Sequence, residues 1–415
     1  MIGEKGIATG ERRRLSAYGM FVFFLLLPFE YPLATFGVGS ILRYAGMAVM
    51  ALAAWDVFYL GGKVRLDYRI LLLAAWMVYA IVSGLWSADQ ELYRRYISMY
   101  INNALMFLVI TAVDYTPKDA KLVMKGLIGG VVLLLLYMIF IPGAVTSSSW
   151  QSRLTLAYKG RELLDQNYLA ALMLMPLGIV FYDLLNTKYK KFRQVVMSAF
   201  IIVVLYYILR TGSRGGVLAA GMVAFLCICL GLKKRRAITW ILLGIILVLT
   251  PAVLNVLPDD LLERFSLQAM MGHTSESGGR LQIWRIAWET IKTGNFVFGY
   301  GAGASETVIG WDYYKDAAVH NALIAQMLEL GLVGLTLFVG LIIKMLQELK
   351  KYEYKKLIYA FSGILVASMF LDVLTTKFFW SGMMMLTVQI NALRNSPTQA
   401  QTEESIKGYM ADVAD

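Results

Sequence analysis

The sequence is poor in charged residues, in cysteine and in histidine, and each shortage excludes a class of protein. Only 16% of its 415 residues are charged and 58% are hydrophobic, whereas soluble chains carry roughly 25% charged residues. A soluble enzyme and a disordered chain are therefore excluded. The two cysteines, Cys227 and Cys229, stand two positions apart in one apolar run, so on a helix they diverge and build no disulfide framework. The two histidines are far apart and show no metal-ligand spacing, so we expect neither a metal nor a cofactor.

Long apolar runs fill most of the chain. A stretch of about 20 apolar residues crosses the hydrocarbon layer of a membrane as a helix, and twelve such stretches are present. They predict an all-α integral membrane protein with about twelve transmembrane helices. The predicted spans are 15–34, 40–60, 68–87, 96–114, 122–142, 167–186, 193–211, 213–232, 237–257, 319–343, 356–373 and 376–393.

The distribution of lysine and arginine orients these spans. Of the 39 basic residues, 25 fall in alternate connections and in the two termini, and connections rich in Lys and Arg face the cytoplasm. The net charge of +11 is therefore a topology signal and indicates no nucleic-acid partner. Because no convincing cleavage site follows the first basic cluster, we expect the first apolar stretch to be a signal anchor. The predicted organisation is a cytoplasmic N-terminus at 1–14, helices over 15–257, a large outer loop at 258–318, helices over 319–393 and a cytoplasmic tail at 394–415.

The large outer loop is rich in aromatic residues, including Trp284, Trp288, Trp311 and Tyr313. The helical periodicity of residues 280–288 predicts an amphipathic helix at the membrane interface. Its Trp and Tyr side chains can anchor the loop among lipid headgroups or stack on a sugar, and these two interpretations are compatible. The Gly-rich segment 298–304 has no βαβ context and predicts a flexible hinge, not a dinucleotide site.

Three outer arginines are the first candidates for chemistry. Arg210 and Arg214 flank a very short turn between two spans, and Arg280 follows two glycines in the large loop. Arginine at a membrane edge is costly unless it is paired or binds a ligand, and the guanidinium fork suits phosphate oxygens. The alternative for the first two is that they end their helices by snorkelling to the interface.

The second candidate is His320, where the large loop meets the next span. A helix N-terminus lowers the pKa of a histidine and so favours the neutral imidazole that a general base needs. A hydrogen-bonded interfacial histidine is the alternative. Arg280 upstream and Glu329 within the following span favour the chemical interpretation.

Six segments of the chain form a recognisable set: Asp165-Gln166-Asn167-Tyr168-Leu169-Ala170, Thr211-Gly212-Ser213-Arg214-Gly215-Gly216, Gly279-Arg280-Leu281-Gln282-Ile283-Trp284, Phe298-Gly299-Tyr300-Gly301, His320-Asn321 and Glu329-Leu330-Gly331-Leu332-Val333-Gly334-Leu335. Taken together, these segments resemble the O-antigen ligase and O-antigen polymerase superfamily of bacterial envelope glycosyltransferases. The resemblance covers about residues 160–340, and the first five spans match only in hydropathy. One departure is Gln166, at a position where many relatives have proline.

The resemblance implies a multi-pass enzyme of the bacterial inner membrane whose active site faces the periplasm. It implies transfer of a glycan from an undecaprenyl-diphosphate carrier to an acceptor sugar, with Arg210, Arg214 and Arg280 binding the diphosphate and His320 as the base. A ligase transfers the glycan to lipid A-core, which is the interpretation we favour, and a polymerase extends a carrier-linked chain. A transporter of lipid-linked glycans is the third hypothesis, although such a protein places polar residues along a path at mid-membrane depth.

Overall fold

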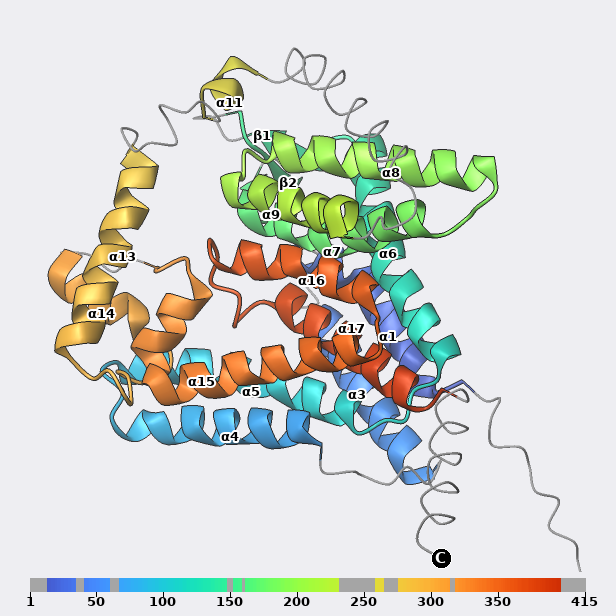
Figure 1. Ribbon diagram of the computed structural model, residues 1–415. Coiled ribbons are helices and arrows are strands. Elements are labelled where there is room, and N and C mark those ends of the chain that lie inside the picture. The colour runs from blue at the N-terminus through green and yellow to red at the C-terminus, as the bar shows by residue number, and fades with distance from the viewer. Residues whose placement is uncertain are drawn as a thin grey trace, which may run out of the picture.

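The computed structural model describes residues 13–34, 41–59, 67–147, 152–158, 161–230, 258–264, 275–313 and 318–396. These residues form a bundle of long helices, drawn in Figure 1. The predicted span 237–257 lies outside the described residues. The bundle helices are α1 (Leu15–Leu26), α3 (Ile41–Tyr59), α4 (Tyr68–Val82), α5 (Gln90–Thr111), α6 (Pro117–Phe140), α7 (Gln166–Asn186), α8 (Lys191–Arg210), α9 (Arg214–Phe225), α15 (Ala322–Lys351), α16 (Lys355–Ser368) and α17 (Lys377–Arg394).

Short elements connect these helices or extend them. Most of them lie at one end of the bundle. Figure 1 shows α13 (Ser275–Thr293) at this end, where its axis makes a steep angle with the axes of α4 and α15. They are η1 (Leu27–Phe29), α2 (Glu30–Ala34), η2 (Ser83–Leu85), β1 (Val145–Ser147), β2 (Leu154–Tyr158), β3 (Arg161–Glu162), η3 (Leu226–Leu230), α11 (Asp259–Arg264), α13 (Ser275–Thr293) and α14 (Ser305–Tyr313).

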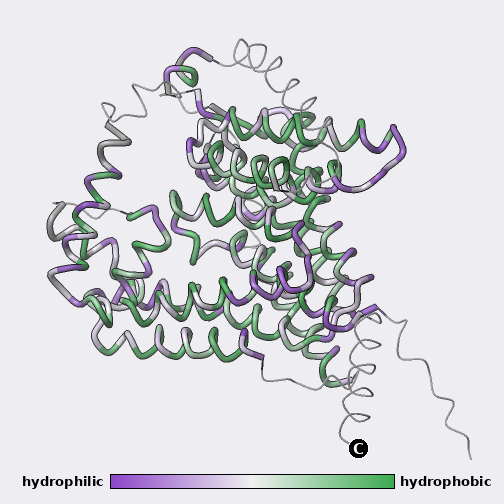
Figure 2. Tube along the Cα trace, viewed as in Figure 1, coloured by the Kyte–Doolittle hydropathy of each residue, from purple (hydrophilic) through white to green (hydrophobic). Residues whose placement is uncertain are grey.

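Seven helical segments in the described part of the chain are long and apolar enough to cross a membrane. The other bundle helices are shorter or less apolar, so the number twelve stays a prediction. Figure 2 shows hydrophobic residues along the helices and hydrophilic residues gathered at their ends. The seven segments are Leu15–Leu33, Ile41–Tyr59, Tyr68–Leu85, Pro117–Phe140, Gln166–Asn186, Lys191–Arg210 and Ala322–Lys351.

The prediction of an all-α membrane protein is confirmed in the mostly helical fold, and one small sheet, which the sequence did not predict, lies in the first long connection that is predicted to face outward. Residues 145–162 form a small antiparallel sheet of order β1-β2-β3, in which Val145 pairs with Leu156 and Ala157 with Glu162. Leu154, Leu156 and Ala157 of β2 are buried, because the sheet packs against other elements, including α7. Such short strands escape a search for 20-residue runs, since strands of this kind need only a few alternating or β-branched residues.

Local sequence signals account for where many helices begin. Side chains of Asp67, Asp89, Asp165, Ser213 and Asn321 each accept a backbone N–H at the start of their helix. Such caps satisfy donors that the first helical turn leaves unpaired. The start of α6 adds a full capping box, formed by Thr116 and Asp119.

Glycines bring several helices into close contact. A Cβ at Gly126 or Gly130 of α6 would lie 2.7 Å or 2.3 Å from backbone oxygens of Phe21 and Phe24 in α1. A Cβ at Gly178 of α7 would lie 2.6 Å from the Cα of Ala360 in α16. Small residues on facing helices allow this close approach, which packs membrane helices through van der Waals contact.

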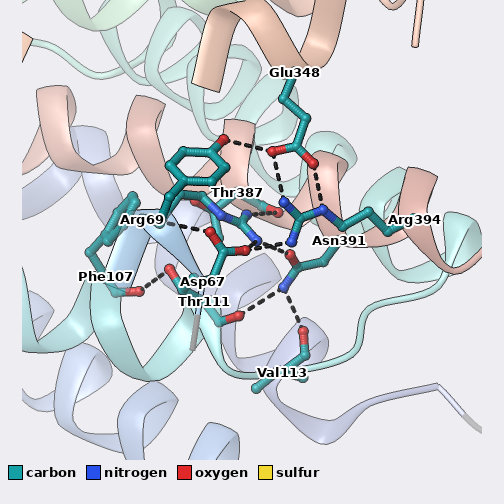
Figure 3. Close-up of polar contacts among 10 residues, drawn as sticks. Asp67, Arg69, Phe107, Thr111, Val113, Glu348, Thr387, Asn391 and Arg394 are labelled. Carbon is teal, nitrogen blue, oxygen red and sulfur yellow. Dashed lines mark hydrogen bonds and ion pairs between the residues drawn. The ribbon is translucent and has the colours of Figure 1, made fainter. Parts of the chain in front are cut away.

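An ion-pair cluster joins helix ends that the charge pattern places on the same, cytoplasmic side. In Figure 3, Arg69 and Arg394 both contact Asp67, and Arg394 also pairs with Glu348. Arg69 donates to Asn391 over 2.7 Å. Although burial raises the pKa of Asp67, the hydrogen bonds and charges of its arginine neighbours lower it to about 2. These contacts bring the predicted cytoplasmic ends of α4, α15 and α17 together.

Candidate functional site

His320 lies at the opposite end of the bundle, between α14 and α15. It directly precedes Asn321, the N-cap of α15, and its backbone is left-handed, with φ +50°. Its Nδ1 atom is buried and has no hydrogen-bond partner among the described residues. A strained backbone and an unpaired buried polar atom both cost free energy, and features of this kind cluster at functional sites.

The surroundings of His320 favour its neutral form. Burial lowers the pKa of His320, and the charge of Arg280 on α13 lowers it further, while Asp165 and Glu306 oppose the shift. The sequence predicted a lowered pKa from the helix N-terminus, and the structure gives the same direction with burial as the largest cause. A neutral imidazole can accept a proton. The structure therefore brings the predicted base and one predicted arginine into electrostatic contact.

Trp284 fixes the segment that carries His320. Its indole Nε1 donates to the carbonyl oxygen of Val319 over 2.9 Å, and its ring centroid lies 6.3 Å from that of Phe370. The predicted amphipathic helix is confirmed as α13, whose residues Ile283, Ala287 and Ile291 are buried at helical spacing.

The other aromatic residues singled out from the sequence differ from Trp284. Trp288 is 51% exposed, and the Nζ atom of Lys292 lies 5.6 Å from its ring centroid. The side chains of Trp311 and Tyr313 lie outside the described part of the structure. Trp288 thus has an open face for lipid or sugar, whereas Trp284 positions the loop.

The arginine turn is built as the sequence predicted, with α8 ending at Arg210 and α9 beginning at Arg214. Ser213 caps α9 by accepting from the backbone N–H of Gly216 over 3.0 Å. A Cβ on Gly215 would lie 2.8 Å from the Cβ of Phe370, the residue that also packs on Trp284. Phe370 therefore connects the arginine turn with the His320 segment. The Nε atom of Arg210 is buried without a hydrogen-bond partner among the described residues.

A further arginine, Arg153, holds this turn, and the sequence did not single it out. Its side chain is buried, with 8% exposed. Its Nε donates to the carbonyl oxygen of Thr211 over 3.0 Å, and its Nη2 donates to Oδ1 of Asn167 over 3.3 Å. Arg153 thereby ties two motif segments, 165–170 and 211–216, to each other. In the sequence, the only indication of a role for Arg153 is that it lies in a predicted outer connection, where basic residues are few.

A buried carboxyl lies further along α15. Glu329, which is 1% exposed, accepts from the hydroxyl of Tyr100 over 2.9 Å and from that of Ser305 over 2.7 Å. The next residue of α14 after Ser305, Glu306, accepts from the hydroxyl of Tyr96 over 2.6 Å. These bonds fasten α14 to α5 and α15 beside His320. No three His, Cys, Asp or Glu side chains in the described ranges gather in an arrangement that could hold a metal ion.

The Gly-rich segment 298–304 is not a hinge, because its backbone is paired with a break in α15. Gly331 has φ +60° and ψ −163°, which interrupts the helix. The N–H groups of Tyr300 and Gly301 donate to the carbonyls of Leu328 and Glu329, each over 2.8 Å, and that of Leu332 donates to Phe296 over 3.0 Å. Broken backbone within a membrane protein must find partners of this kind. The site is therefore held by backbone pairing between two of the motifs.

The break in α15 predicts that one added methyl group at Gly331 strongly lowers the stability of the protein. Residues with side chains hardly adopt the conformation of Gly331, and its Cβ would lie 2.3 Å from the carbonyl oxygen of Val297. We expect Gly331→Ala to destabilise the protein by about 3 kcal/mol, measured as a lower unfolding temperature in detergent. Gly340 is the matched control, because it lies in the same helix with no atom within 4 Å of its Cβ position. Gly340→Ala should unfold at or above the wild-type temperature; equal behaviour of the two variants would refute this account.

Comparisons with known proteins agree with this arrangement. Residues 199–339, which include the arginine turn, Arg280, His320 and the break in α15, match the family model described as O-antigen ligase. The teichuronic acid biosynthesis protein TuaE of Bacillus subtilis is 23% identical over 362 residues, covering 79% of this chain and 72% of its own length. The chain is therefore similar to proteins of the O-antigen ligase and polymerase superfamily, in agreement with the resemblance seen in its sequence.

Proposed function

We propose that this protein transfers a glycan from undecaprenyl diphosphate to a carbohydrate acceptor at the periplasmic face of the bacterial inner membrane. The observation that carries the proposal is the buried Nδ1 of His320, which lies beside Arg280 and has no hydrogen-bond partner in the described part of the chain. Such a base is available to a substrate hydroxyl, and a guanidinium next to it suits a diphosphate. The family match and the run of apolar helices support a membrane enzyme that acts on a lipid-linked glycan.

The reaction assigns a separate role to each group. The acceptor hydroxyl oxygen attacks the anomeric carbon and its proton passes to the imidazole of His320, while the bond from that carbon to the diphosphate oxygen breaks. Arg210, Arg214 and Arg280 bind the diphosphate and stabilise the negative charge that grows on it. Since diphosphate is a good leaving group, the step needs no general acid. Attack opposite to the leaving group inverts the configuration at the anomeric carbon.

For the acceptor we propose a sugar of lipid A-core, which makes the protein an O-antigen ligase. The description of the matching family supports this choice. The relative named for teichuronic acid biosynthesis favours a second candidate, a polymerase whose acceptor is a carrier-linked chain. Both candidates use the same donor and the same base.

The envelope glycans of a deletion strain distinguish these two acceptors. Loss of lipid A-linked polymer together with accumulation of long carrier-linked chains is the expected result for a ligase. Lipid A-core capped with a single repeat unit would instead identify a polymerase. A deletion strain in which neither glycan changes would refute the proposed transfer, and plasmid-borne wild-type protein restoring the original profile is the control.

A further inference from the structure

A cavity of about 670 Å³ lies among α1, α3, α5, α7 and α17, apart from the residues assigned to the transfer. Its size falls in the range of small-molecule sites. The lining changes along the helix axes. Arg43, Ser98 and Lys377 line it near the helix ends that are predicted to face outward, whereas Met50 and Met384 line it seven residues further along α3 and α17, about 10 Å deeper. The cavity is therefore polar toward the outer face and apolar toward the middle of the membrane.

The outer part of this cavity adjoins the candidate site. Tyr168 lines the cavity, and its hydroxyl donates to the carbonyl oxygen of Asp372 over 2.8 Å. Leu164 also lines it and directly precedes Asp165, whose charge acts on His320. A ligand that fills the cavity would thus have its outer end close to the residues that surround His320.

We propose that the cavity holds the first isoprene units of the lipid-diphosphate donor. This inference rests on the proposed function and deepens it, because it names the lipid chain as a recognised part of the substrate. Arg43 has no ion-pair partner among the described residues and stands at the polar end, where it adds positive charge for an anionic headgroup.

The side chains that line the cavity suit a single branched isoprenoid chain. Five methionines line the cavity, and their unbranched, polarizable side chains adapt to irregular apolar shapes. The volume of about 670 Å³ is sufficient for part of a single isoprenoid chain. The ligase and the polymerase share the donor lipid, so the inference is independent of the choice between them.

Gly46 offers a way to fill the cavity without changing a polar residue. Its Cβ would point at the Sδ atom of Met106 at 3.5 Å and at Phe23 at 3.7 Å, both of which line the cavity. These are ordinary contact distances, so a side chain here can grow into the open space. Gly340→Leu is the matched control, since it makes the same change on α15 where no atom lies within 4 Å.

The test uses the purified full chain in nanodiscs and undecaprenyl diphosphate with a diazirine in its first isoprene units. Crosslinks are mapped by mass spectrometry, and we expect them on Met50, Met106 or Met384. The yield should fall about tenfold or more in Gly46→Leu and stay at the wild-type level in Gly340→Leu. Unlabelled undecaprenyl diphosphate should compete, whereas phosphatidylglycerol and inorganic pyrophosphate should not.

Several results would overturn the inference. Crosslinks confined to the outward-facing Phe58 or Tyr44 would place the chain in bulk lipid, and equal competition by phosphatidylglycerol would make the cavity a general lipid site. The probe carries no sugar, so crosslinking that persists in a protein without transfer activity would refute the proposed function alone. Conversely, a Gly46→Leu variant with wild-type transfer would refute the lipid site and leave the proposed function standing.

Discussion

Replacing His320 with asparagine should lower the rate of glycan transfer on the order of 10²- to 10⁴-fold, the usual contribution of a general base. Asparagine is among the side chains that tolerate a left-handed backbone, so the φ of +50° can be kept. The imidazole Nδ1 makes no hydrogen bond with the described residues, so its loss breaks none of the bonds that hold the fold there. The measurement is the transfer rate of purified protein with an undecaprenyl-diphosphate-linked glycan, beside its unfolding temperature.

The pH dependence of the same assay gives an independent check. The imidazole acts as a base only when neutral, so the rate falls as the pH falls through its pKa. Because burial and Arg280 lower the pKa of His320, the acid limb of the wild-type profile should lie below the ordinary value for histidine, about 6.5. The residual rate of His320→Asn should lack this limb. Wild-type transfer by the variant, at an unchanged unfolding temperature, would show that His320 is not the base.

The helices could be predicted because their causes are local. Each signal is contained in one continuous stretch of sequence. The signals are an apolar run long enough to cross a membrane, a capping side chain such as Asp165 or Asn321, and the helical spacing of Ile283, Ala287 and Ile291. The turn between Arg210 and Arg214 was predicted for the same reason. The described helices that carry these signals begin, run and end as the signals would lead one to expect.

The rest of the site depends on contacts between distant segments. The break at Gly331 is stabilised by backbone bonds from residues about thirty positions earlier, so its own sequence shows only a glycine among apolar residues. Arg153 reaches partners 14 and 58 residues away. One sequence cannot reveal such partners, and for that reason a flexible hinge was predicted where the structure has a paired segment.

Replacing Arg280 should have the second largest effect, and two substitutions separate its two roles. Arg280→Gln removes both the guanidinium fork and the charge, so we expect transfer to fall on the order of 10²- to 10³-fold, as when one preorganised donor is lost. It should also move the acid limb to higher pH, because the charge of Arg280 lowers the pKa of His320. Arg280→Lys keeps the charge and loses the bidentate geometry, so its acid limb should stay near the wild-type position while its rate falls.

The control for these variants is Arg285→Gln, the same change on an exposed position of the same helix, which should transfer at the wild-type rate with an unchanged pH profile. The decisive comparison is the rate at high pH, where His320 is neutral in every variant. If Arg280 binds the diphosphate, the loss in Arg280→Gln persists there, because the missing donor does not depend on the state of the imidazole. If the rate instead returns to the wild-type value, Arg280 acts only through the pKa of His320, and the diphosphate must be bound by other cations, for which Arg210 and Arg214 are the remaining candidates.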